Sequence, residues 1–114
     1  GVNDIAANKT TEEMKALAVS AIQAARARNA RVVFTTVGPY DAASGAQQTV
    51  MNEYNTFIKA IGVPVLDLNQ MCNSGSNTFA SYCTSGDGLH PGQSFNGGAE
   101  RWGKGFLDML PLLP

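Results

Sequence analysis

Near the end of the chain, Asp87 and His90 place a carboxylate and an imidazole with two residues between them. In a loop or in the first turn of a helix, this spacing lets the carboxylate reach the ring. A carboxylate there fixes the tautomer of the imidazole and stabilises the imidazolium that forms when the ring accepts a proton. Pro91 and Gly92 follow and stiffen the next turn. The pattern is typical of a general base with its orienting acid, although a histidine in a glycine-rich loop is commonly just solvated.

A second candidate group is the side-chain amide of Asn3, which follows a glycine at the start of the sequence. An amide N–H that points into a cleft stabilises the oxyanion of a tetrahedral intermediate. The competing interpretation is a helix or turn cap, which Asn and Asp provide routinely. On its position alone, Asn3 fits the cap better than the oxyanion role.

The two cysteines, Cys72 and Cys83, lie in a segment rich in Asn, Ser and Gly, which predicts an irregular loop. Two interpretations are open: two separate thiols, or one disulfide that closes the loop just before Asp87. An even number of cysteines in a polar loop favours the disulfide, which in turn predicts an exported protein, secreted or periplasmic. Two cysteines and one histidine fall short of the ligands of a closed zinc site, so we expect no metal.

The composition predicts one globular unit and excludes several classes of function. The chain has 114 residues, of which 44% are hydrophobic and 15% charged, and its net charge is -1. This is not the composition of a disordered tail, and it offers no basic surface for nucleic acid. No apolar run approaches the roughly 20 residues that span a bilayer, and the first residues lack the pattern of a signal peptide.

Three helices are predicted to carry the scaffold around these side chains, because apolar residues recur at helical spacing over residues 10–29, 47–61 and 99–110. Thr10 and Glu13 have the spacing of a capping box at the start of the first helix, and Gly62 is placed to cap the end of the second. The first helix is expected to bury one apolar stripe: Met14, Leu17, Ala18, Ala21, Ile22 and Ala25. The third carries its apolar residues on one side: Trp102, Phe106, Met109 and Leu110.

Two apolar runs, 31–37 and 63–68, predict strands that are covered on both faces, as in a parallel sheet. Strands that alternate with helices predict an α/β fold. Two strands are too few, however, since sheets usually contain about 4–6, and an open edge would remain. We therefore expect residues 1–114 to be part of a larger domain that continues upstream, with the turn at residues 1–4 following a preceding strand.

Two short blocks at the two ends of the chain together resemble the SGNH (GDSL-like) hydrolase family. Residues 1–4, Gly-Val-Asn-Asp, are similar to the Gly-x-Asn-Asp block of that family, and residues 87–90, Asp-Gly-Leu-His, to its Asp-x-x-His block. The order of helices and strands between the blocks also fits. The resemblance spans essentially the whole chain and corresponds to the C-terminal half of such a domain.

The resemblance implies a three-layer α/β/α sandwich with a flavodoxin-like parallel sheet of about five strands. It also implies ester hydrolysis through an acyl-enzyme, without metal or cofactor, on short acyl esters, acetylated sugars or lipids. In that scheme His90 is the general base that activates a serine and then the acid for the leaving group, and Asp87 orients it. Asn3 is an oxyanion donor, and Asp4 supports the turn.

The serine of the family is missing from this chain, because its Gly-Asp-Ser block and the block that supplies an oxyanion glycine are both absent. No serine here follows a strand in the strained turn that exposes a nucleophile. We therefore assign no nucleophilic role to Ser74, Ser76, Ser81, Ser85 or Ser94. Two accounts remain: an N-terminal fragment of the same hydrolase supplies the serine as a second chain, or the chain is a non-catalytic binding or assembly module. We favour the first.

Three aromatic residues in predicted loops, Tyr40, Phe79 and Tyr82, have two interpretations. They either flank the acyl or leaving group of a substrate, or they cover the edge of the core. The second interpretation is favoured, because aromatic side chains contribute large apolar areas to a core.

Overall fold

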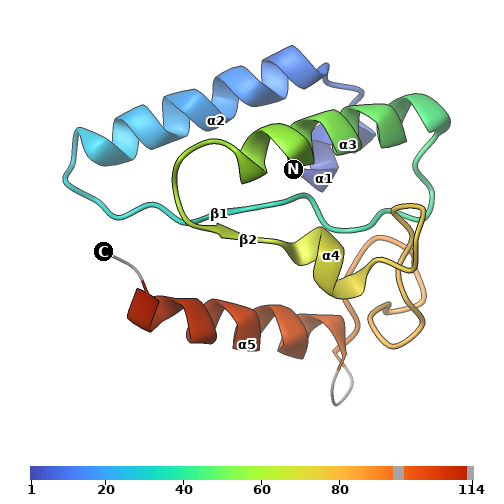
Figure 1. Ribbon diagram of the computed structural model, residues 1–114. Coiled ribbons are helices and arrows are strands. Elements are labelled where there is room, and N and C mark those ends of the chain that lie inside the picture. The colour runs from blue at the N-terminus through green and yellow to red at the C-terminus, as the bar shows by residue number, and fades with distance from the viewer. Residues whose placement is uncertain (94–96, 113–114) are drawn as a thin grey trace.

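Helices lie on both sides of a small parallel sheet (Figure 1). Helices α2 (Thr11–Arg26) and α3 (Gly45–Lys59) cover one side, and α5 (Gly98–Met109) lies on the other. This computed structural model describes residues 1–93 and 97–112. Parallel strands joined through a helix make an α/β fold, as the sequence predicted.

The sheet is shorter than the two apolar runs suggested. Strands β1 (Phe34–Thr35) and β2 (Val65–Leu66) pair in parallel, and each has two residues. Just beyond β1, on the edge away from β2, the buried side chain of Asn55 bonds to the backbone of Val37. Its Oδ1 accepts the Val37 N–H at 2.7 Å, and its Nδ2 donates to the Val37 carbonyl at 3.0 Å. The predicted strands 31–37 and 63–68 are thus correct in place but too long, because few of their residues have a partner strand.

The first long helix begins as predicted. Thr10 accepts the Glu13 N–H at 3.2 Å, and the Glu13 carboxylate accepts the Thr10 N–H at 2.8 Å, which completes the capping box. The predicted buried stripe is too broad, since Leu17 is 52% exposed. Helix α2 packs against α3 along one narrow side, so its remaining apolar residues face solvent. The buried cluster between the helices and the sheet contains Ile5, Met14, Ala18, Val37, Ala43, Met51, Tyr54 and Ile58.

The cysteine segment is more regular than predicted, because it begins with helix α4 (Leu68–Cys72). Asp67 caps this helix by accepting the Gln70 N–H at 3.0 Å. The predicted disulfide between Cys72 and Cys83 is present, with an S–S distance of 2.05 Å. Both cysteines are fully buried.

The Gly-Val-Asn-Asp segment was expected to form a turn, and this expectation is wrong. Gly1 is the N-cap of a short helix, α1 (Val2–Ala6), whose first bond runs from the Ile5 N–H to the Gly1 carbonyl at 3.1 Å. Asn3 lies within the first turn of this helix, and no side chain caps the helix start. The capping interpretation of Asn3 is therefore also wrong.

The apolar side of α5 is only partly covered. Trp102 is half-buried, whereas Phe106 is 43%, Leu107 64% and Leu110 44% exposed. The helix passes into a 3-10 turn, η1 (Leu110–Leu112). Within the described ranges, no helix combines the length and the apolar character that a membrane crossing requires.

Candidate active site

A tight hairpin over residues 84–91 carries the predicted acid and base. Thr84 and Pro91 form an antiparallel bridge, and the Ser85 N–H donates to the His90 carbonyl at 3.2 Å. The tip turns on two glycines with positive φ, Gly86 at 96° and Gly88 at 69°, a region that L side chains rarely occupy. The sequence Gly-Asp-Gly is what makes so sharp a tip accessible.

The structure brings Asp87 and His90 together, with Oδ2 of the carboxylate 2.7 Å from Nδ1 of the ring. The other carboxylate oxygen, Oδ1, accepts three further donors: the Leu89 N–H at 2.9 Å, the His90 N–H at 2.9 Å and the Ser85 hydroxyl at 2.8 Å. The bond with the His90 ring, followed by these others, holds the pKa of Asp87 well below its usual range. An ionised Asp87 assigns the proton of a neutral ring to Nδ1, which leaves the lone pair of Nε2 free to accept another.

The ring of His90 borders a pocket of about 250 Å³ at the carboxyl end of β1. Its lining comes from the segment at and after β1, the start of α4, α5 and the first two residues of the chain. The lining residues are Gly1, Val2, Thr35, Thr36, Val37, Gly38, Pro39, Leu68, Leu89, His90, Pro91 and Trp102. A more open hollow of about 480 Å³ lies on the other side of His90, over Ser85 and Gln93. His90 thus stands at the boundary of two spaces, and 67% of its side chain is exposed.

Asn3 lies beside this pocket without lining it. Its neighbours Gly1 and Val2 reach the pocket, but Asn3 is exposed, and its side chain makes no hydrogen bond within the described part of the chain. Asp4 lies 3.7 Å from Lys9 and 3.8 Å from the N-terminal ammonium group. These contacts are compatible with the predicted role of Asp4 as a support for the start of α1. That role stays a prediction.

Within residues 1–93 and 97–112, no serine hydroxyl is hydrogen-bonded to the ring of His90, whose partner is Asp87. The Ser85 hydroxyl points at Asp87 rather than at Nε2 of His90, and Ser74 bonds to Thr78 at 2.6 Å. Ser76 and Ser81 are exposed in the cysteine segment. Ser94 lies outside the described residues. Ser85 therefore supports the acid of the pair, a role that sequence spacing did not reveal.

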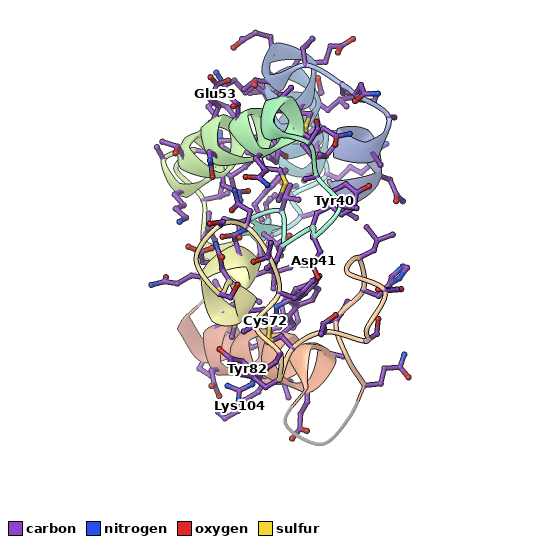
Figure 2. All side chains as sticks on the ribbon, turned by 90° about the vertical axis from the view of Figure 1, so that its right-hand side faces the viewer. Tyr40, Asp41, Glu53, Cys72, Tyr82 and Lys104 are labelled. Atoms are coloured by element: carbon purple, nitrogen blue, oxygen red, sulfur yellow. A yellow bond between two sulfur atoms is a disulfide. The ribbon has the colours of Figure 1, made fainter. Side chains whose placement is uncertain are left out.

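Two of the three loop aromatics cover the core. Tyr40 packs against the main cluster, and Phe79 is buried beside the disulfide, with its ring 6.4 Å from that of Trp102. Tyr82, labelled in Figure 2, is exposed. The guanidinium of Arg101 lies 4.4 Å from the centre of its ring. The favoured interpretation is confirmed for Tyr40 and Phe79.

Sequence reasoning missed Asp41, which lies in the loop after β1 and touches two other loops. Its N–H donates to the Gly88 carbonyl at 2.8 Å, next to Asp87. Its Oδ1 accepts the Phe79 N–H at 2.6 Å. The one available signal was an aspartate two residues after the Gly-Pro break of residues 38–39, in a position typical of turns.

The fold is similar to that of a GDSL-like lipase from Bacteroides thetaiotaomicron, known from its crystal structure. The TM-score is 0.77 at 20% sequence identity, and the match covers 98% of this chain. The chain spans 59% of the length of that lipase. No protein-family model and no curated protein matches the sequence. The predicted resemblance is thereby confirmed for the fold.

Proposed function

We propose that this chain supplies the general base, its orienting carboxylate and an oxyanion donor to an SGNH-type ester hydrolase of the Ser-His-Asp kind. The observation that carries the proposal is the 2.7 Å contact between Asp87 and His90 at the edge of an apolar pocket. In the reaction, Nε2 of His90 accepts the proton of a serine as its oxygen attacks the ester carbonyl, and then donates it to the leaving alcohol. Asp87 keeps the ring in the required tautomer and stabilises the imidazolium.

Asn3 is the proposed oxyanion donor. Its side chain has no partner within the described residues, and the residues on its N-terminal side border the same pocket as His90. An amide that turns toward the pocket would meet the carbonyl oxygen of a substrate as negative charge develops on it. Asp4 would hold the helix start that carries this amide.

The serine comes, in this proposal, from a second polypeptide, the N-terminal fragment of the same hydrolase. Two features support such a partner: an exposed apolar surface on α5, formed by Phe106, Leu107 and Leu110, and the free edge of β1. A strand from the partner would extend the sheet at that edge, and a helix would cover the α5 surface. The complete assembly would be the three-layer sandwich with about five parallel strands.

The substrate class is an ester whose acyl or alcohol part fits a largely apolar pocket: a short acyl ester, an acetylated sugar or a lipid. The scheme requires neither metal nor cofactor. The buried disulfide supports a secreted or periplasmic location, since such bonds persist in oxidising compartments.

The test isolates this chain with its bound partners from the source that produces it, and measures mass and labelling by a serine-reactive fluorophosphonate. We expect a second, labelled polypeptide, since the reagent requires an activated serine. A His90→Gln variant should abolish labelling, and Glu12→Gln, whose side chain is 83% exposed on α2, should leave it unchanged. A single species of 12.0 kDa, or an unlabelled homodimer, would favour the non-catalytic module.

A further inference from the structure

Asp41 connects three loops that meet beside the candidate active site. It belongs to the loop between β1 and α3, and Figure 2 shows it extending from there toward the region of the disulfide. Its carboxylate accepts the Phe79 N–H, and Phe79 packs on the buried Cys72 and Cys83. One residue before it, the Tyr40 N–H donates to the Asn77 carbonyl at 2.8 Å. The loop after β1 is therefore fixed to the cysteine segment.

The same residue holds the tip of the hairpin. Across the residues that the structure describes, the bond from the Asp41 N–H to the Gly88 carbonyl is the only backbone hydrogen bond between the tip, residues 86–89, and the chain outside the hairpin. The contact is close, since a Cβ added to Gly88 would lie 2.7 Å from Cβ of Asp41. Gly88 directly follows Asp87, so its position sets where the carboxylate of Asp87 stands.

The other bonds of Asp87 cannot fix the pair in space. They all run to Ser85, Leu89 and His90, which are residues of the hairpin itself. They join the acid to the base while the hairpin is closed, but they neither keep the hairpin closed nor hold the pair against the pocket. An exposed hairpin with few anchors opens readily, and a catalytic group must stay within a fraction of an ångström of its productive position.

We propose that Asp41 is a positioning residue, which fixes Gly88 against the cysteine segment and thereby keeps the Asp87–His90 contact formed and aimed at the pocket. Its catalytic consequence rests on the proposed function, whereas its effect on the geometry of the pair does not. Loss of the carboxylate releases Phe79, loosens the loop after β1 and frees the hairpin tip.

The test compares Asp41→Ala with Asp41→Asn, which retains an acceptor oxygen for the Phe79 N–H. Nitrogen-15 NMR of the His90 ring reports which nitrogen carries the proton of the neutral form. We expect the Nδ1–H tautomer to dominate in the parent chain and in Asp41→Asn. In Asp41→Ala, we expect a mixture and about tenfold faster amide exchange at Leu89 and His90, whose N–H groups bond to Asp87.

The control is Asp108→Ala, which removes an exposed carboxylate paired with Lys104 on α5. It should change neither readout. An unchanged tautomer and unchanged exchange in Asp41→Ala would overturn the proposal, as would an equal effect of Asp108→Ala. If Asp41→Ala does not fold, Asp41→Ser is measured in its place under the same criteria. Because neither readout involves turnover, the result is independent of whether the partner with a serine exists.

Discussion

At the scale of single residues, the hairpin shows how a short motif fixes a protonation state. One oxygen of Asp87 is bonded to the ring of His90, and the other accepts two amides and a hydroxyl. Such a carboxylate is held ionised, and an ionised partner is what the base requires. The Asp-x-x-His spacing alone predicted the contact between the two side chains. The spacing did not reveal the contacts of Ser85 and Asp41. Ser85 meets Asp87 only because the hairpin folds back on itself, and Asp41 comes from a distant loop.

The pH dependence of the pair follows from the depressed pKa of Asp87. The bond with the His90 ring is the largest of the interactions that lower this pKa, ahead of the amide bonds. A carboxyl whose folded pKa is lowered contributes stability above the ordinary value of about 3.9, and loses it as the pH falls toward the folded pKa. We expect the carbon-13 titration of Asp87 to have its midpoint below about 3.9, and to move upward in His90→Ala. A midpoint that is unchanged in His90→Ala would contradict the assignment.

His90 itself is the sharpest catalytic test. In an assembly that contains the serine, His90→Ala should lower kcat by about 10⁴–10⁶-fold, since no other group can accept the serine proton. The measurement is steady-state hydrolysis of a short-chain nitrophenyl ester, with Glu12→Gln on α2 as the surface control. Near-normal turnover in His90→Ala would remove His90 from the mechanism.

At the scale of elements, the three long helices were predictable, whereas the strands were predictable in place but not in length. Residues such as Thr10 and Glu13 mark a helix start by local hydrogen bonds, which the sequence states directly. A strand forms only where the backbone of another strand pairs with it. On one edge β1 pairs with β2, and on the other the side chain of Asn55 bonds to Val37, just beyond β1. Helix α4 was missed because a polar composition was taken as a loop, although Asp67 is a good N-cap.

Asn55 gives a stability prediction at this scale. Replacing it with Ala leaves the N–H and the carbonyl of Val37 without partners in a buried place, and should lower the free energy of unfolding by about 1–3 kcal/mol. Urea unfolding followed by circular dichroism measures the change. Thr56→Ala, one residue along the helix, removes an exposed hydroxyl bonded within α3 and serves as the control. Equal stabilities of the two variants would mean that Asn55 does not seal the edge.

At the scale of the whole molecule, the uneven covering of α5 is the main feature that composition could not reveal. Its apolar residues are on one side, as expected, but most of that side is open. The chain spans 59% of the length of the lipase whose fold it shares. In the proposed assembly, the partner would cover the open side of α5 and bring the serine to Asp87 and His90.

A substitution on the exposed apolar surface of α5 should weaken binding of a partner without lowering the stability of the free chain. Leu107→Lys should change the stability of the free chain by less than about 0.5 kcal/mol, because Leu107 is already 64% exposed. In the proposed assembly, the same substitution would bury a charge and weaken binding of the partner by at least about tenfold. Thermal unfolding and native mass spectrometry measure the two effects, with Glu12→Gln on α2 as control. A strong loss of stability in the free chain would show that α5 is packed rather than open.

The side-chain amide of Asn55 also limits how another strand can pair with β1. Asn55 occupies both backbone groups of Val37, so the free edge ends with Thr35, where the lining of the pocket begins. An added strand can therefore pair only with the residues that precede Val37. The segment after this added strand must leave the sheet where the pocket of His90 begins. A single asparagine would in this way limit the register of an incoming strand at the end of β1 that borders the pocket of His90.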